Sequence, residues 1–439
     1  MPAATLGRVS TWTSWAGLSS CSPAQERRPV DVGDVVEAVR DAADRGGRVK
    51  MPGTGHSFSD IALTDGTLLH PTALTGVVGV DRAAMTVTAL AGTTLRELNA
   101  TLARLGLSLH NMGDVEEQTV AGAISTGTHG TGGVKASLSA QVVGLELVTG
   151  TGEVLRADRT QHTDVLEVAR LGLGATGVLT TITLEVEPLF LLQAHERPLR
   201  WQEAIADFDA LAEDHHHAEM YWFPHTDRLL LKANDRSLED PEPLSRLREW
   251  WDDELLSNRV FDLVNRAGNA RPSLVPRLNA LSARALGERR YRDVPHRVFT
   301  TRRTVRFREM EYAVPRAAGL TALAEIRDLV ERSGWRIGFP LEYRVAPADD
   351  VPLSPAHDRD VAWIAVHVNA AADHTDYFAG VEAVLRAHDG RPHWGKLHTR
   401  TAADLAPAYP RWKDALAVRD RLDPERLFTN DHLDRVLGA

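Results

Sequence analysis

The spacing of hydrophobic and polar positions changes near residue 188 of this chain. Before that point, short stretches with a helical period alternate with stretches in which every second residue is apolar. The clearest of them predict a helix over 94–104 and a strand over 178–186. Two strand-like runs, 141–148 and 153–156, flank a Thr-Gly-Thr-Gly turn and predict a hairpin. The first part of the chain therefore mixes helices and strands closely.

The pattern after residue 188 has a different texture. Glycine becomes rarer, tryptophan and arginine become more frequent, and 238–290 is charged and largely helical in pattern. Three strand-like pieces follow at 298–307, 338–345 and 361–369. Strands that are grouped in this way favour a second α+β body with an antiparallel sheet.

Chain length agrees with a division into parts, since 439 residues exceed one typical domain. We predict an α+β fold with a first domain over 1–188, a second over 189–400 and a short helical segment over 401–439. Hydrophobic residues make up 43% of the chain and charged residues 25%, so the chain can bury a substantial core.

Net charge and cysteine content narrow the environment. A formal charge of -10 argues against nucleic acid or an anionic membrane as the main partner. The single cysteine, Cys21, cannot form an internal disulfide, which fits a reducing compartment. The first 21 residues lack the pattern of a signal peptide, and no run reaches the ~20 apolar residues of a membrane span. We therefore expect a cytoplasmic protein.

The first candidate for chemistry is the segment Gly53-Thr54-Gly55-His56-Ser57-Phe58. Glycines directly after a strand allow backbone amides to point into one concavity, which can hold a diphosphate. The segment is neither a dinucleotide fingerprint, because Phe58 replaces the third glycine, nor a P-loop. The alternative is a tight turn with an exposed histidine.

A second candidate is the Gly/Thr-rich run from Gln118 to Gly133, which follows the pair Gly113-Asp114. Such a run lets the main chain approach a flat ligand while hydroxyl and amide groups bind its polar edge. A flexible linker is the alternative, but the apolar Val120 and Ile124 argue against it. The run therefore predicts contact with a cofactor.

Polar residues of the second body form a third candidate set. Glu342 and Arg344 lie two apart in a predicted strand, so both face the same side. His367 and Asn369 repeat this spacing, and Lys396 follows in a loop. If the strands are neighbours, the set can remove a proton from a hydroxyl and stabilise charge on its oxygen. A surface ion pair beside unrelated histidines is the alternative.

The run His215-His216-His217 does not predict a metal site. Its histidines are contiguous rather than at ligand spacing, and they lie in a polar stretch. A solvated segment is the simpler interpretation, and we predict no bound metal.

Three motifs together resemble one family. GTGHSFSD at 53–60, EQTVAGAISTGTHGTG at 117–132 and RPHWGK at 391–396 are similar to motifs of the vanillyl-alcohol-oxidase-type flavoproteins. Within that group the sequence resembles the aldonolactone oxidoreductases and the alditol oxidases. The resemblance implies a two-lobed FAD-binding domain, built from 1–188 and the C-terminal segment, under a substrate-binding cap over 189–400.

The resemblance also implies how FAD is held. It implies a covalent bond between the flavin and His56, which withdraws electrons from the ring and favours oxidation of an unactivated alcohol. The other implied cofactor-binding residues are Gly53, Thr54, Gly55, Ser57, Thr119, Gly122, Ser125, Gly127, Thr128, His129, Val178 and His393.

For catalysis the resemblance implies roles for four residues. Glu342 and Arg344 match a substrate-binding pair, in which Arg344 stabilises charge on the reacting oxygen. His367 matches the general base of alditol oxidases. Lys396 is implied to lie beside the flavin, where it stabilises the reduced, anionic form.

Two departures bear on the substrate. Alditol oxidases have serine at the place of Asp114 and threonine at the place of Asn369, and both bind polyol hydroxyls there. Asp114 and Asn369 remain candidate substrate-binding residues here, but the polyol interpretation is weakened. Gly113 stands where family members control access of oxygen to the flavin, and a glycine there favours an oxidase.

We therefore expect an oxidase that acts on the secondary alcohol of an aldono-1,4-lactone, such as gulono- or arabinonolactone, and produces hydrogen peroxide from oxygen. The alternatives are an alditol oxidase acting on xylitol or sorbitol, and a lactone dehydrogenase with another acceptor. A non-catalytic flavin-binding or carbohydrate-binding protein is disfavoured, because Glu342, Arg344, His367 and Lys396 occur together. The pattern does not predict an oligomeric state.

Overall fold

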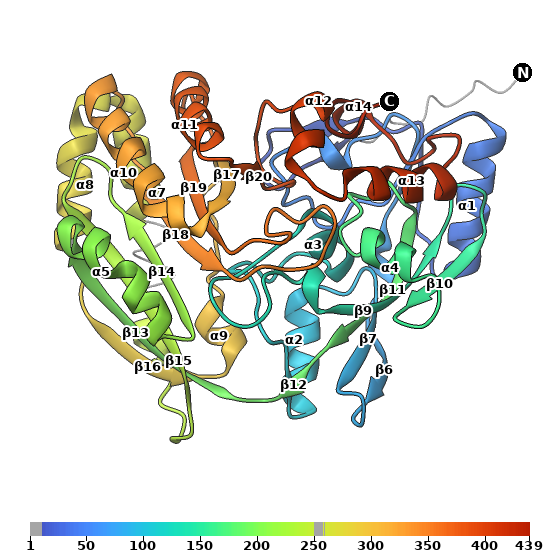
Figure 1. Ribbon diagram of the computed structural model, residues 1–439, viewed down its shortest axis with the longest axis horizontal. Helices are drawn as coiled ribbons and strands as arrows, with labels where there is room; N and C mark the ends of the chain where they lie inside the picture. The colour runs from blue at the N-terminus through green and yellow to red at the C-terminus, as the bar shows by residue number, and fades with distance from the viewer. Residues whose placement is uncertain (1–10, 250–257, 259) are drawn as a thin grey trace, which may run out of the picture.

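The computed structural model describes residues 11–249, 258 and 260–439. The first ten of the 21 residues that lack the pattern of a signal peptide therefore lie outside the description. Two lobes lie side by side (Figure 1). One contains a five-stranded sheet and the other an eight-stranded sheet. The predicted α+β class is confirmed.

The five-stranded sheet is antiparallel, in the order β10-β9-β11-β7-β6. Its strands are β6 (Val77–Asp81), β7 (Thr86–Leu90), β9 (Val142–Val148), β10 (Val154–Asp158) and β11 (Val178–Glu185). The predicted hairpin is confirmed, because Val154 pairs with Val148 in register. The predicted helix over 94–104 is α2 (Leu95–Arg104). It begins with a capping box, in which the side chains of Thr94 and Glu97 each accept a hydrogen bond from the backbone amide of the other residue.

A smaller parallel sheet, β3-β5-β4, completes this lobe. Its elements are β3 (Gln25–Arg27), β4 (Val49–Lys50), β5 (Thr67–Leu69) and α1 (Val32–Asp44). Further elements of the lobe are β1 (Trp12–Thr13), β2 (Ser20–Cys21), β8 (Leu107–Ser108), β12 (Glu187–Pro188), α3 (Val120–Thr126) and α4 (Thr163–Ala169).

The C-terminal segment returns to the N-terminal lobe. Its helices are α12 (Ala402–Leu405), α13 (Trp412–Leu422) and α14 (Asp431–Leu437). The Arg421 guanidinium on α13 pairs with Asp164 on α4 at 2.5 Å. The Asn430 side-chain amide donates to three carbonyl oxygens of the segment 60–63. The last helices therefore pack on the part of the chain that carries the first glycine motif (Figure 1).

The eight-stranded sheet has the order β16-β13-β15-β14-β18-β19-β17-β20, with antiparallel pairing throughout. Its strands are β13 (Leu191–Arg200), β14 (His217–Trp222), β15 (Arg228–Ser237), β16 (Arg289–Asp293), β17 (Phe307–Pro315), β18 (Leu341–Ala346), β19 (Val361–Asn369) and β20 (Arg391–Pro392). The predicted antiparallel sheet is confirmed.

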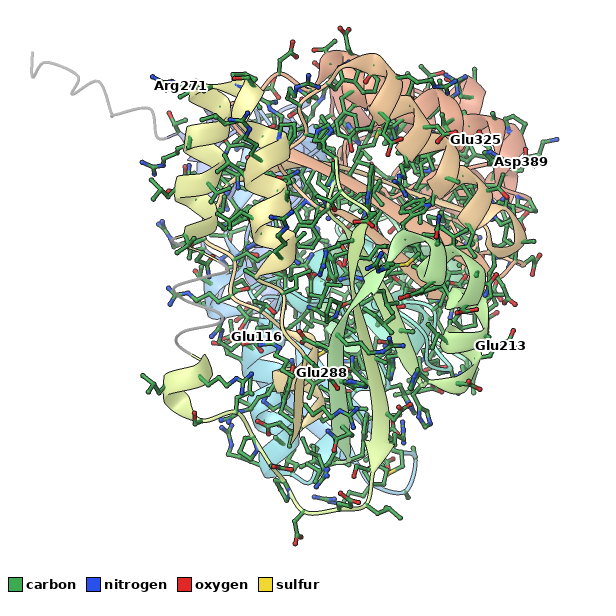
Figure 2. All side chains as sticks on the ribbon, turned by 90° about the vertical axis from the view of Figure 1, so that its left-hand side faces the viewer. Glu116, Glu213, Arg271, Glu288, Glu325 and Asp389 are labelled. Carbon is green, nitrogen blue, oxygen red and sulfur yellow. The ribbon has the colours of Figure 1, made fainter. Side chains whose placement is uncertain are left out.

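Helices cover one face of this sheet. They are α5 (Trp201–Asp214), α10 (Arg316–Ser333) and α11 (Thr375–Ala387). Their apolar side chains pack on alternate residues of the central strands, such as Met220, Met310 and Tyr343. Charged side chains, including Glu213 and Glu325, lie on the outer surface of these helices (Figure 2). The alternation of a strand leaves the remaining residues on the opposite face, toward the other lobe.

One sequence prediction for this lobe needs correction. The segment 298–307 is not a strand, because Pro295 begins the short helix α9 (Pro295–Phe299) and β17 starts only at Phe307. The segment 238–290 is helical over most of its described residues, as predicted, while 250–257 and 259 lie outside the description. Its described helices are α6 (Arg246–Glu249), α7 (Phe261–Ala270) and α8 (Val275–Arg284).

The second glycine-rich loop joins the lobes. The Gly132 amide donates to Val345 O at 2.6 Å, and the Val345 amide donates to Thr131 Oγ1 at 3.2 Å. His217 Nδ1 donates to Thr131 O at 2.7 Å. These bonds fix the loop against β14 and β18, at the face of the sheet that carries no helices.

The structure therefore corrects the interpretation of the triple-histidine run as solvated, because His217 is buried in β14. Burial lowers the pKa of His217 from 6.5 to about 4. The unfolded chain binds a proton near pH 6.5 that the folded protein accepts only near pH 4, so stability must fall as the pH falls through this window.

We expect His217→Gln to reduce this acid-side loss of stability, because glutamine can donate to Thr131 O but does not titrate. The largest contribution of one such histidine is about 1.4 kcal/mol per pH unit. Urea unfolding of both proteins between pH 7 and pH 4 measures it. Equal dependence of the free energy of unfolding on pH in the two proteins would show that His217 contributes nothing.

Among the residues that the structure describes, no helix combines the length and the apolar character needed to cross a membrane.

Candidate active site

Two adjoining cavities follow the glycine-rich loops. The wider one measures about 750 Å³ and lies between these loops and the open face of the eight-stranded sheet. The narrower one measures about 110 Å³ and follows the first glycine loop into the N-terminal lobe. His56, Ser57 and Thr126 line both cavities, so the two form one elongated space.

Most of the predicted cofactor-binding residues line the narrower cavity. They are Gly53, Thr54, Gly55, His56, Ser57, Thr119, Gly122, Ser125 and Val178. A Cβ atom on Gly53 would lie 2.5 Å from Thr119 Oγ1, and Gly55 has a φ of +76°. Gly53 thus allows the two loops to approach each other closely, and Gly55 allows the left-handed backbone of the first loop.

The remaining predicted cofactor residues lie elsewhere. Thr128, His129 and His393 line the wider cavity. Gly127 lines neither, because it ends α3 with a φ of +79° and packs against Leu171. Its role is to turn the chain from Thr126 to Thr128.

FAD fits this elongated space. The narrower cavity combines polar backbone from two glycine loops with apolar side chains such as Ile61 and Phe428. This pairing suits a diphosphate attached to a flat ring. The wider cavity offers the cationic Lys396 and enough room for a second ring system and a small substrate.

His56 lies where the cavities meet. Trp15 stacks on its imidazole with ring centroids 5.2 Å apart, and Nδ1 lies 2.9 Å from Thr54 Oγ1. Burial lowers the pKa of His56, and the charge of Lys396 adds to this effect while Glu117 opposes it. The ring is therefore oriented and held in its neutral, nucleophilic form.

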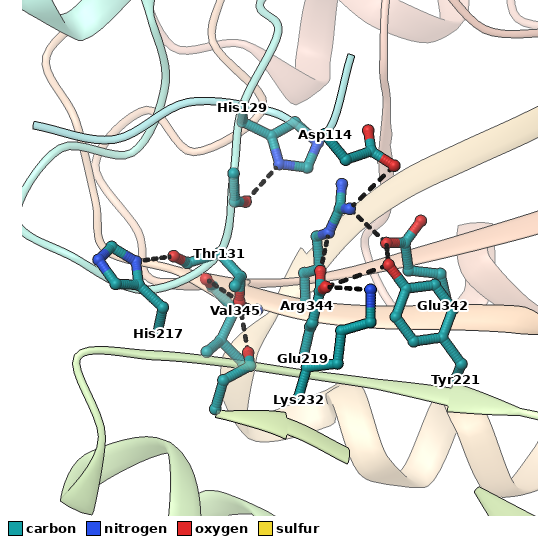
Figure 3. Close-up of polar contacts among 12 residues, drawn as sticks. Asp114, His129, Thr131, His217, Glu219, Tyr221, Lys232, Glu342, Arg344 and Val345 are labelled. Carbon is teal, nitrogen blue, oxygen red and sulfur yellow. Dashed lines mark hydrogen bonds and ion pairs between the residues drawn. The ribbon is translucent and has the colours of Figure 1, made fainter. Parts of the chain in front are cut away.

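Arg344 is the centre of a charged network on the open sheet face (Figure 3). Its guanidinium donates to Glu219 at 2.7 Å, pairs with Glu342 and lies 3.6 Å from Asp114. Alternation along β18 places Glu342 and Arg344 on this face while Tyr343 packs under the helices. Glu342 and Arg344 face the same side of the strand, as predicted, and they form a buried ion pair with two additional carboxylates beside it.

Glu342 is the carboxyl group of this network that favours protonation. Tyr221 donates to it at 2.7 Å. Burial and the neighbouring charges of Glu219 and Asp114 raise the pKa of Glu342, although Arg344 opposes the shift. The network thus includes one carboxyl group whose affinity for a proton is raised by its surroundings.

Asp114 lies at the edge of the same network. It pairs with Arg303 as well as with Arg344. Although burial acts in the opposite direction, these two charges hold the pKa of Asp114 well below its usual range. Asp114 is therefore held as a carboxylate, and its Oδ2 faces both guanidinium groups.

Glu309 connects His367 with Lys396. One carboxylate oxygen lies 3.5 Å from His367 Nε2, and the other accepts from Lys396 Nζ at 2.5 Å. Although burial raises it, the charge of Lys396 leads the effects that lower the pKa of Glu309 to about 2. His367 Nδ1 donates to Pro340 O at 3.1 Å, so Nε2 is the nitrogen available to accept a proton.

A third buried group contains His129, Glu311 and His393. His129 stacks on Trp363 at 3.8 Å, and its Nε2 lies 3.2 Å from Glu311. The three residues converge closely enough to bind a cation. However, His393 Nδ1 accepts from the Gly395 amide, so its Nε2 carries the proton in the neutral ring. That tautomer does not suit a metal ligand.

Asn369 is the predicted site residue that the structure does not bring to this cavity. It ends β19, where its Oδ1 accepts from Asn269 at 3.0 Å and from the Ala371 amide. It lines a separate, small cavity beside α7. Because β19 ends at Asn369 and this side chain bonds with Asn269 on α7, the spacing shared with His367 does not place both side chains in the wider cavity.

The sequence pattern misses several residues of the wider cavity. Glu309 and Glu311 alternate with apolar residues in β17, a signal that the incorrect limits of the predicted strand obscured. Arg303 comes from the loop before β17, and Glu219 and Tyr221 come from β14. Local sequence carries no signal that would bring these last three to Arg344.

Comparison with known proteins agrees with this architecture. The FAD binding domain profile matches residues 23–158, and the D-arabinono-1,4-lactone oxidase profile matches residues 182–436. The L-gulono-1,4-lactone dehydrogenase of Mycobacterium tuberculosis is 42% identical over 97% of this chain and 99% of its own length.

The chain belongs to the D-arabinono-1,4-lactone oxidase family. The alditol oxidase of a Streptomyces species is 31% identical over 97% of this chain and 99% of its own length. A solved structure of a Brevibacterium sterolicum cholesterol oxidase variant superposes with a TM-score of 0.82 at 18% identity, over 100% of this chain and 99% of that one. The fold is thus that of the vanillyl-alcohol-oxidase-type flavoproteins, and the chain is an FAD-dependent oxidoreductase that acts on CH–OH groups.

Proposed function

We propose that this enzyme oxidises the C2 hydroxyl of an aldono-1,4-lactone and carries its FAD covalently on His56. The observation that carries this proposal is the position of Arg344, His367 and Lys396. All three line one cavity that the His56 loop also borders. The family profile supports the substrate class.

In this proposal 1–188 and 401–439 form the FAD-binding domain, and 189–400 forms the substrate-binding cap. Gly53, Thr54, Gly55 and Ser57 hold the diphosphate, and Lys396 and His393 lie toward the flavin. FAD, when bound, accepts the hydride from the carbinol carbon. The packing of the C-terminal helices on α4 and on the segment 60–63 supports this division.

The side chains account for the movement of the proton. His367 Nε2 accepts the proton of the substrate hydroxyl, and the Glu309 carboxylate stabilises the imidazolium that results. Arg344 stabilises negative charge on the reacting oxygen, since its N–H groups face the same cavity. Glu309 also keeps Lys396 in its charged form, because the carboxylate leads the effects that raise the pKa of Lys396 against burial.

Oxygen is the proposed electron acceptor. Gly113 lines the wider cavity beside Thr128 and His129, and the wall is so closely packed there that a side chain would have to displace it; an undisturbed wall at this place supports access of oxygen. An acceptor other than oxygen is a second candidate, because the Mycobacterium tuberculosis relative carries the name dehydrogenase. Oxidation of alditols is the other alternative, in view of the Streptomyces relative.

An oxygen electrode tests the proposal with gulono- and arabinono-1,4-lactone on one side and xylitol and sorbitol on the other. We expect turnover of a lactone with stoichiometric hydrogen peroxide. Turnover of alditols alone would contradict the substrate class, and lactone oxidation that requires an artificial acceptor would contradict the role of oxygen.

Gly113→Ala should slow the reaction of reduced flavin with oxygen more than the reduction of flavin by substrate. The added Cβ would lie 3.0 Å from His129 O and 3.1 Å from Thr128 Cγ2, so these residues of the cavity wall would have to shift. Stopped-flow measurement of the two half-reactions separates the effects. Gly287→Ala is the control, because a Cβ there meets nothing within 4 Å. An equal slowing of both half-reactions would dismiss a gating role.

A further inference from the structure

Arg303 is a second guanidinium in the wider cavity, beside Arg344. It comes from the loop between α9 and β17, which is fastened at two points. The Thr301 amide donates to Asp114 O at 3.0 Å, and the Thr304 amide and hydroxyl each donate to Asn258 Oδ1 at 2.9 Å. Asn258 is itself buried. The loop therefore holds Arg303 in place rather than leaving it to solvent.

Asp114 orients this guanidinium. One terminal nitrogen of Arg303 donates to Asp114 Oδ2, the oxygen that also faces Arg344. The other N–H groups of Arg303 have no hydrogen-bond partner within the described part of the chain. Arg303 thus borders the cavity with a fixed orientation and with free donors.

We propose that Arg303 binds the carbonyl oxygen of the substrate lactone and makes the enzyme prefer lactones to alditols. This inference rests on the proposed function and assigns its substrate selectivity to one side chain. Asp114 is then a positioning residue that acts through Arg303, not a group that binds substrate hydroxyls.

The hydrogen-bonding character of the two substrate classes supports this assignment. The carbonyl and ring oxygens of a lactone only accept hydrogen bonds, whereas every hydroxyl of an alditol also has a proton to donate. The carboxylates of Asp114, Glu219 and Glu342 already bond with guanidinium groups. In Asp114 and Glu342 the guanidinium groups engage only Oδ2 and Oε1, respectively, and the N–H groups of Arg303 that do not face Asp114 are the donors left at this edge of the cavity. These free donors match an acceptor such as a lactone carbonyl.

The test uses Arg303→Met, which replaces the aliphatic stem of arginine with an unbranched apolar side chain and removes the donors, and Arg303→Lys, which keeps the charge. Anaerobic reduction of the flavin gives the rate constants and apparent affinities for gulono-1,4-lactone and xylitol. Inhibition constants for γ-butyrolactone, which has the lactone carbonyl but no hydroxyl to oxidise, report binding alone. A hydrogen bond from a charged donor predicts that Arg303→Met weakens γ-butyrolactone binding about ten- to a hundredfold.

In Arg303→Met the affinity for gulono-1,4-lactone should fall together with that for γ-butyrolactone, while the rate constant and the affinity for xylitol stay within about threefold of wild type. Arg303→Lys should recover part of the lost lactone affinity. Arg297→Met is the control, because Arg297 is exposed on α9, pairs with Asp293 of β16 and does not line the cavity. Unchanged binding of γ-butyrolactone in both Arg303 variants, or equal losses for lactone and xylitol, would overturn the inference. A wild-type enzyme that reduces its flavin with xylitol but not with lactone would instead contradict the proposed function.

Discussion

Arg344→Met should slow the reduction of flavin by the lactone about 10²- to 10³-fold, while the protein still folds and binds FAD. The guanidinium is the shared partner of Glu219, Glu342 and Asp114 and the donor that faces the reacting oxygen. Methionine has similar length but donates nothing. Anaerobic stopped-flow absorbance at the flavin band measures the rate directly.

Arg344→Lys separates charge from geometry. Lysine keeps the positive charge that the three carboxylates require but cannot donate to two of them in a fixed plane. We expect its rate to lie between those of the wild type and Arg344→Met, with unchanged flavin content in both variants. If Arg344→Met reduced its flavin at nearly the wild-type rate, Arg344 would have no part in the reaction.

His56→Ala should abolish covalent attachment of the flavin. In the proposal the bond to the His56 imidazole is the only covalent link between the protein and the flavin ring. The lowered pKa of His56 keeps the imidazole in the neutral, nucleophilic form that is needed to make this bond. Precipitation with acid should therefore give a colourless pellet and a yellow supernatant, whereas the wild-type pellet stays yellow. Any FAD that remains bound should be reduced more slowly, because the ring loses an electron-withdrawing substituent.

Ser59→Ala is the matched control, since Ser59 borders the narrower cavity close to His56 but has no part in the proposed bond or in the proposed binding of the diphosphate. Its pellet should remain yellow. A yellow pellet from His56→Ala would place the attachment at another residue, and a colourless pellet from the wild type would mean that FAD is bound without a covalent link.

Sequence alone predicts the parts of this site that depend on local spacing. Alternation in β18 is enough to place Glu342 and Arg344 on one face, and two glycine loops are enough to predict a cofactor bed. The pairing of β18 with β19 then brings His367 to the same cavity, as expected for neighbouring strands. These features follow from the period of a strand and the conformational freedom of glycine.

The parts that escape prediction depend on contacts between distant segments. Arg303 meets Asp114 across 189 positions of sequence, through a loop that the pattern assigns to a strand. Asn369 shows the converse. It lies two residues after His367, as a residue on the same strand face would, but β19 ends at Asn369 and the side chain accepts a hydrogen bond from Asn269. Strand ends and loop directions are set by tertiary packing, which no local period encodes.

The most direct test of the central claim is anaerobic mixing of the purified, flavin-loaded enzyme with gulono- or arabinono-1,4-lactone, followed by mixing with oxygen. The account predicts loss of the oxidised flavin absorbance within the turnover time, and then its return with one hydrogen peroxide formed per flavin. Flavin that stays oxidised with every lactone, but is reduced by an alditol, would contradict it.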